Sequence, residues 1–413
     1  MNARLLSVLL RQSASVFFVF GVMAYVYSCF HKYDWGHPLI KLFCFMTVFF
    51  LIVFLRSRAD SDQPSPIFVK IEVVVWAIVL ALLATVYFNS YGPGLWRPPS
   101  IDVGFTTVRA TTTFFQGGLN PYSVDNINVR SGLPVEYRGF HYGPIMFIGY
   151  FPALFSPAEG YKFATLIYLM LSALLLLLLF QPNNTTRWEN WTATALFGLC
   201  LFLLPERLWY ELFLQGSNDV FPVMFILGSL LALQRQRYFW SGVLLGLSFS
   251  AKFSPALFLT IALLRKDLRR SLVNGFLAGL TPLFLFALWD AKGIFNNVFW
   301  NRGIALPFDS TSLYSIIPPA WDFLFPLSLL AAVGYSIYRN YAVPIDYENV
   351  LVTFTLLLIV AEVTFKQVHG NHLLWFYPLF SLCLAEHRHF LFRWRIKTRD
   401  LTLQREAKLA PEG

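Results

Sequence analysis

The sequence predicts an all-α protein that crosses a membrane many times. Only 13% of its 413 residues are charged, whereas soluble proteins carry about a quarter. Apolar runs close to the roughly 20 residues that span a bilayer as a helix recur along the chain. They lie at 14–30, 38–55, 68–88, 160–180, 271–289, 318–338, 347–365 and 372–386. These runs are continuous and do not alternate with period two, which favours helices over strands, and we expect about 11 to 13 membrane helices.

Basic residues indicate how these helices are oriented. Arg4 and Arg11 precede the first run, and Arg56 and Arg58 follow the second. Further basic positions between or after runs are Arg235, Arg237, Arg265, Lys266, Arg269, Arg270, Arg339 and several residues from Arg388 onward. Cytoplasmic loops carry an excess of Lys and Arg, so we expect both the N-terminus and the C-terminal tail in the cytoplasm. The formal charge of +9 is then explained without a nucleic-acid partner.

The same charges place 89–144, 291–317 and 366–371 on the outer face. One inconsistency follows, because three apolar runs between residues 142 and 205 lie where the charges demand an even number of crossings. The run at 142–155 is short and contains two prolines, so either it or the run at 192–205 does not cross.

A second local problem surrounds Lys252. A single helix over 239–264 would begin and end at cytoplasmic charges, which one crossing cannot do. We therefore expect a hairpin that places Lys252 near the outer face. The chain then divides into two extra N-terminal helices in 1–67, a membrane domain over 68–390, and a basic tail over 391–413.

The first outer loop, within 89–144, is the longest polar interval of the chain. Asp102 follows two prolines and is expected at or near the start of a helix that continues through Thr111 to Phe115. Arg109 lies two turns further along the same face. The pair could act as a general base and a phosphate clamp, although an aspartate at this position could equally be an N-cap.

Two further polar clusters lie at predicted helix boundaries. Gln215 to Asp219 precede an apolar helix at 220–234, where they could cap the helix or contact a substrate. A carboxylate at a membrane boundary is costly unless it is paired or wetted, which favours a functional Asp219. Lys252 could extend its ammonium to the interface or could contact a phosphate.

The late outer segments add a cationic group. Arg302, Lys366, His369 and His372 would form a wall suited to a phosphate. The two histidines have the i, i+3 spacing of a zinc pair, but no third ligand follows at a metal-motif spacing. We therefore expect neither a metal nor another cofactor.

The order of these motifs resembles the GT-C membrane glycosyltransferases, in particular glycosyltransferase family 87, which is related to polyprenol-phosphate-mannose-dependent mannosyltransferases. The matching elements are Asp102, Gly118–Leu119–Asn120–Pro121–Tyr122, Tyr142–Gly143–Pro144, Gly216–Ser217–Asn218–Asp219, Trp240–Ser241–Gly242 through Gly246, Ala251–Lys252–Phe253–Ser254–Pro255, and His372 ahead of Trp375 to Pro378. Two details depart from the family pattern. Gly143 stands where a proline is usual, and Gln215–Gly216 inverts the common order.

The resemblance implies a GT-C fold whose long first outer loop carries short juxtamembrane helices. It implies transfer of a hexose, with mannose as the expected sugar, from a polyprenyl-phosphate donor to a lipid or glycan acceptor, with inversion and with Asp102 as general base. Candidate donor-phosphate or substrate contacts are Arg109, Asn120, Tyr122, Tyr142, Gln215, Asn218, Asp219, Lys252, Arg302, His369 and His372. The expected location is a prokaryotic cytoplasmic membrane.

Two other functions are compatible with the composition. A secondary transporter or lipid-linked sugar translocase also places ionisable groups among apolar helices, but transporters gather them near mid-membrane, whereas here they gather at one face. A non-catalytic membrane scaffold would leave the outer carboxylate dispensable.

Overall fold

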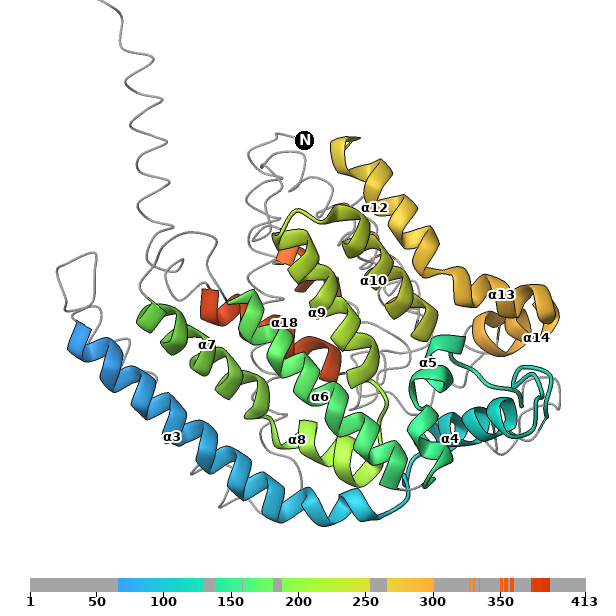
Figure 1. Cartoon of the computed structure of the whole chain (residues 1–413), viewed down its shortest axis with the longest axis horizontal. Coiled ribbons are helices and arrows are strands. Elements are labelled where there is room, and N and C mark those ends of the chain that lie inside the picture. Colours follow the sequence, from blue (N-terminus) through green and yellow to red (C-terminus); the bar gives the residue numbers. More distant parts are fainter. Residues whose placement is uncertain are drawn as a thin grey trace, which may run out of the picture.

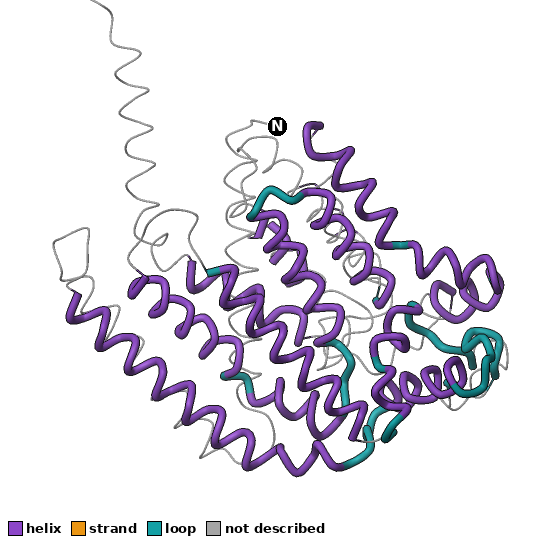
Figure 2. The backbone as a smooth tube through the Cα atoms, in the orientation of Figure 1, coloured by secondary structure: helices purple, strands orange, loops and turns teal. Residues whose placement is uncertain are grey.

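The computed structural model describes residues 66–300, apart from 126, 129–137, 158, 181–187 and 253–265, and then residues 327, 330 and 334, most of 350–359, and 373–386. Throughout these residues the regular elements are helices and no strand occurs (Figure 2). The prediction of an all-α polytopic membrane protein is confirmed. The predicted N-terminal helices, the candidate site residues Arg302, His369 and His372, and the basic tail lie outside the described residues.

The elements follow one another as shown in Figure 1. They are α3 (Pro66–Tyr91), η1 (Gly92–Trp96), α4 (Asp102–Phe115), α5 (Pro144–Gly149), η3 (Phe151–Leu154), α6 (Glu159–Leu179), α7 (Trp188–Leu203), α8 (Glu206–Trp209), η4 (Tyr210–Gln215), α9 (Val220–Gln234), α10 (Tyr238–Ala251), α12 (Lys266–Gly279), α13 (Thr281–Trp289), α14 (Ala291–Ile294), η5 (Phe295–Trp300) and α18 (Leu373–Glu386). Elements η4 and η5 have the wider π-helical geometry.

By length and composition, two described helices can cross a membrane, namely Val69–Trp96 and Glu159–Leu179. Two bent pairs pass the same test when each is taken as one span. Trp191–Leu203 meets Glu206–Gln215 at 65°, and Arg269–Gly279 meets Thr281–Val298 at 49°. A proline lies at or just after each break, and proline removes a helical hydrogen bond and clashes with the preceding turn. The continuous helix expected over 271–289 is therefore wrong, because it is interrupted at Leu280.

The run at 142–155 does not form a membrane-crossing helix. It is divided between α5, of six residues, and η3, of four, which is far short of the roughly 20 residues that a crossing requires. The prediction that this run or 192–205 would be the exception is confirmed for 142–155, whose two prolines each open one of the short helices.

Helices α9 and α10 form an antiparallel hairpin. Ser229 donates a hydrogen bond to the carbonyl of Ser241, and Ser248 donates to the carbonyl of Pro222, both at 2.8 Å. Contacts in this order require the two helices to run in opposite directions. Since they have similar lengths, the residue before α9 and the residue after α10 reach the same end of the bundle.

Helix α12 runs parallel to α10 and packs unusually close to it. Each helix has a Gly-x-x-x-Gly pair, Gly242 and Gly246 on α10 and Gly275 and Gly279 on α12. A methyl group placed on Gly242 or Gly246 would lie 2.1 or 2.3 Å from a carbonyl oxygen of α12. Small residues at this spacing let helix backbones touch. Helix α12 thus starts at the end where α10 starts; the second half of the hairpin predicted around Lys252 lies outside the described residues.

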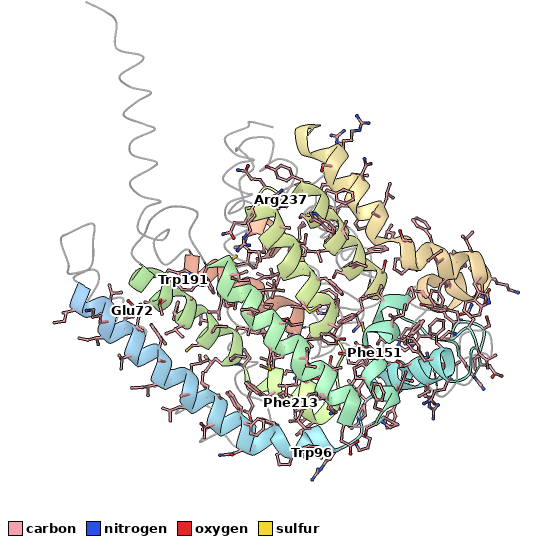
Figure 3. All side chains as sticks on the ribbon, viewed as in Figure 1. Glu72, Trp96, Phe151, Trp191, Phe213 and Arg237 are labelled. Atoms are coloured by element: carbon pink, nitrogen blue, oxygen red, sulfur yellow. The ribbon has the colours of Figure 1, made fainter. Side chains whose placement is uncertain are left out.

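The two ends of the bundle differ in character. Figure 3 shows Arg237 at one end and Trp96 and Phe213 at the opposite end. We call the first the arginine end; it also carries Arg235, beside Arg237 in the α9–α10 turn. The second, the loop end, holds α4 and the segments on either side of it (Figure 2).

Candidate active site

A buried ion pair joins the α9–α10 hairpin at the loop end. The ammonium of Lys252 lies 2.5 Å from Oδ1 of Asp219, and both side chains are almost fully shielded from solvent. The indole Nε1 of Trp375 donates to the same oxygen at 2.7 Å, and the hydroxyl of Ser217 donates to Oδ2 at 2.7 Å. Asp219 is thus paired, as a buried carboxylate requires.

This arrangement argues against a capping role for Asp219. The residue occupies the N-cap position of α9, but its side chain makes no capping hydrogen bond. Its carboxylate is directed to α10 and α18 instead. The cluster therefore ties three helices together, with the pair Asp219 and Lys252 at its centre.

Tyr142 covers the ion pair from the segment that precedes α5. The Lys252 ammonium lies 4.7 Å from the centroid of the Tyr142 ring, a cation–π arrangement. The next residue, Gly143, donates its N–H to the carbonyl of Ala251 at 3.0 Å. A methyl group on Gly143 would lie only 1.9 Å from the Ser250 carbonyl oxygen. A proline here would lose that hydrogen bond, so this close approach explains the departure from the family pattern at this position.

Helix α4 docks on the same cluster through a buried amide. Asn218 donates from Nδ2 to the hydroxyl of Thr107 at 2.9 Å. Thr111, one turn later, donates to the carbonyl of Phe147 at 3.0 Å. The threonine face of α4 is therefore buried, and its opposite face is left exposed.

Asp102 and Arg109 lie on that exposed face of α4. Asp102 is the first residue of the helix, and Ile101 is the N-cap. Asp102 is therefore not the N-cap, although one of its carboxylate oxygens accepts the N–H of Val103 at 2.8 Å. The predicted helix is confirmed, and the two side chains are about 10 Å apart along its axis.

The start of α4 is held by the end of η4. The carbonyl of Gln215 accepts the N–H groups of Ser100 at 2.8 Å and Ile101 at 3.2 Å. Gly104 packs directly on Gly216, and a methyl group on Gly104 would lie 2.7 Å from the Gly216 carbonyl oxygen. Gly216 has φ of 81°, a left-handed conformation that glycine adopts without strain. The backbone carbonyl of Gln215 thus holds the two residues that precede Asp102.

The Gly-x-Asn-Pro-Tyr turn fixes the other end of the loop. Asn120 accepts the N–H of Tyr122 through Oδ1 at 3.1 Å, forming an Asx turn. The buried hydroxyl of Tyr122 donates to the carbonyl of Tyr142 at 2.8 Å. Burial raises the pKa of the Tyr122 hydroxyl well above its ordinary value, so the group stays a neutral donor. Asn120 and Tyr122 thus support the fold of the loop.

A cavity of about 280 Å³ opens beside this turn. It is lined by Tyr122, Ser123, Val124, Asp125, Gly139, Asp290, Lys292, Gly293 and Asn296. Ser123 donates to Asp290 at 2.6 Å, and Asn297 donates to the carbonyl of Tyr122 at 3.1 Å. These bonds join the loop between α4 and α5 to the segment after α13, a link that the sequence did not indicate.

The described structure brings Asn218, Asp219, Lys252 and Tyr142 together and places Asp102 and Arg109 on the adjoining helix. Sequence reasoning missed Trp375 and Lys162. Trp375 was included only as part of an aromatic run, and Lys162 is a lone lysine near the start of an apolar run. Among the described residues, no group of three His, Cys, Asp or Glu side chains could hold a metal ion.

A family model described as glycosyltransferase family 87 matches residues 140–365, which is more than half of the chain. The matched range includes Tyr142, Asp219 and Lys252 and begins after α4. No curated protein matches the chain.

Proposed function

Because the chain belongs to glycosyltransferase family 87, and is thus a membrane glycosyltransferase, we propose that it moves a hexose from a polyprenyl-phosphate donor to a lipid or glycan acceptor. Mannose is the sugar that we propose. The observation that carries the mechanism is the exposed carboxylate of Asp102 on an anchored helix at the loop end. The family match begins after this residue, so its role rests on position and chemistry.

In the proposed reaction, Asp102 acts as general base. The acceptor hydroxyl attacks the anomeric carbon, and its proton moves to the Asp102 carboxylate as the new C–O bond forms. The bond between the anomeric carbon and the donor phosphate oxygen breaks, and polyprenyl phosphate leaves with the electron pair. Attack opposite to the leaving group inverts the anomeric centre. An aspartate is ionised and able to accept a proton at neutral pH.

The leaving phosphate gains negative charge, which a nearby cation stabilises. Arg109 shares the exposed face of α4 with Asp102 and can form a bidentate contact with phosphate. We propose that Arg302, His369 and His372 complete this binding site. The Lys252 charge is balanced by Asp219, so we assign Lys252 to the support of the loop end rather than to direct contact with the phosphate.

The loop end faces the outside in this proposal, and the arginine end faces the cytoplasm. Arg235 and Arg237 lie together in the exposed turn between α9 and α10, and Arg269 and Arg270 lie in the first turns of the parallel helix α12. This grouping supports the orientation that the positive-inside rule assigns.

The test is an assay in membranes containing the full chain, using a panel of radiolabelled polyprenyl-phosphate sugars. Lipid and glycan products are separated and counted. The proposal predicts a labelled glycosylated product with one donor, and polyprenyl-phosphate mannose is the donor expected. Movement of intact donor across the membrane without a new glycosidic product would instead identify a translocase.

A further inference from the structure

Lys162 is a fully buried lysine whose ammonium contacts no carboxylate in the described part of the chain. The residue lies in the first turn of α6 and has no solvent exposure. Its Nζ donates to the carbonyls of Phe213 at 2.6 Å and Leu214 at 3.3 Å. Removing an ammonium from water is costly, and a methionine would fill a similar volume without that cost. The charge therefore calls for an explanation.

The two carbonyls that accept from Lys162 lie at the end of η4, a π-helix that ends at Gly216. Carbonyls in a last helical turn lack partners within the helix, and the left-handed Gly216 ends this one. Two neighbours on α6 supply donors. Lys162 binds the carbonyls of Phe213 and Leu214, and the Tyr161 hydroxyl donates to the Gly216 carbonyl at 2.8 Å. Together they fix the path of the chain from 213 to 216.

The same short segment holds the residues immediately before Asp102. The Leu214 carbonyl, which accepts from Lys162, also accepts the Ser100 hydroxyl at 3.2 Å. The neighbouring carbonyl of Gln215 accepts the N–H groups of Ser100 and Ile101. Hydrogen bonds thus run from the Lys162 ammonium through the Leu214 carbonyl to Ser100, two residues before Asp102 and the start of α4.

We propose that Lys162 is a positioning residue for glycosyl transfer, which sets the location of the Asp102 carboxylate through the Leu214 and Gln215 carbonyls. The inference rests on the proposed role of Asp102. A general base must lie within hydrogen-bond reach of the hydroxyl that it deprotonates, and a displacement of about 1 Å can lower a rate about 10²-fold. Loss of Lys162 therefore lowers turnover more than it lowers substrate binding.

The experiment measures kcat and both KM values for the full-length protein in membranes, with amounts normalised to folded protein. Lys162→Met is expected to lower kcat about 10²-fold, with little change in either KM. Lys162→Arg, which keeps a cation and its donors, is expected to recover most of the loss. Ser172→Ala is the matched control, because Ser172 is a fully buried polar residue further along α6, and its kcat is expected to equal that of the wild type.

Ser100→Ala keeps the test decisive if Lys162→Met does not fold. Ser100 is exposed, so its replacement preserves the core, and the loss of the bond to Leu214 is expected to lower kcat several-fold without a change in KM. Wild-type kcat in folded Lys162→Met overturns the proposal, and if that variant does not fold, wild-type kcat in Ser100→Ala overturns it. A loss of kcat in Ser172→Ala equal to that in Lys162→Met also overturns the proposal.

The failure of this inference differs from failure of the proposed function. Near-wild-type turnover of Asp102→Asn would overturn the assignment of the base, and with it the premise used here. An inactive Asp102→Asn beside fully active Lys162→Met and Ser100→Ala would overturn the positioning role alone.

Discussion

The Lys252 ammonium lies 2.5 Å from the Asp219 carboxylate, although the two residues are 33 positions apart in the sequence. The α9–α10 hairpin brings them to the same end of the bundle. Trp375 on α18 and the Tyr142 ring close over the pair. A buried pair with these partners fixes several segments relative to one another at the loop end.

Breaking this pair on one side should strongly destabilise the protein. Asp219→Asn leaves the Lys252 charge buried without a counter-charge, and we expect a loss of about 3 to 5 kcal/mol in unfolding free energy. Thermal unfolding in detergent measures the effect. The double variant Asp219→Asn/Lys252→Met should be more stable than Asp219→Asn, because no buried charge remains unpaired. A double variant no more stable than Asp219→Asn would contradict a direct coupling.

The glycine contacts between α10 and α12 should tolerate no larger side chain. Gly246→Leu is expected to abolish stable folding, since even a methyl group there would lie 2.3 Å from the Phe276 carbonyl oxygen. Gly228→Ala is the control, because its nearest neighbour is the flexible end of the Leu244 side chain at 3.2 Å. Size-exclusion chromatography of detergent extracts separates the outcomes. A monodisperse Gly246→Leu protein would show that the helices are not packed backbone to backbone.

Tyr122 should contribute through hydrogen bonding and not through ionisation. Tyr122→Phe removes the bond to the Tyr142 carbonyl, and we expect a loss of about 1 kcal/mol in stability. Because burial raises the Tyr122 pKa, the hydroxyl stays protonated, so the pH dependence of activity between pH 6 and 9 should be the same in both proteins. A basic limb in the wild-type profile that disappears in Tyr122→Phe would refute this.

The sequence was sufficient for the fold class and for most described helix positions. Continuous apolar runs predicted α3 and α6, and charge counting predicted that one short run would not cross. The hairpin predicted around Lys252 lies partly outside the described residues and stays a prediction, with which the parallel packing of α10 and α12 is compatible. These features follow from hydrophobic length and from the distribution of basic residues, which are local properties of the chain.

Contacts between distant segments could not be predicted in the same way. Asp219 was expected to need a partner, but nothing in the sequence identifies Trp375, which is 156 residues away. The break at Leu280 was missed because only the apolar length of the run was considered, although Pro282 follows two residues later and proline disrupts a helix. Lys162 was missed because a lone lysine near a helix end is ordinarily an interface residue, and only the packed η4 carbonyls give it a specific role.

The central claim is that Asp102 deprotonates the acceptor, and Asp102→Asn tests it directly. The variant keeps the shape of the side chain and an oxygen to accept the Val103 N–H, so the protein should remain folded and bind its donor. Removing a general base typically costs about 10²- to 10⁴-fold in rate. Glu159→Gln, at the first turn of α6, is the matched control and should remain active.

The decisive measurement is the initial rate of sugar transfer by Asp102→Asn in membranes, at equal amounts of protein and saturating labelled donor. The account predicts a loss of at least about 10²-fold with donor binding retained. Transfer at a rate near that of the wild type would contradict it.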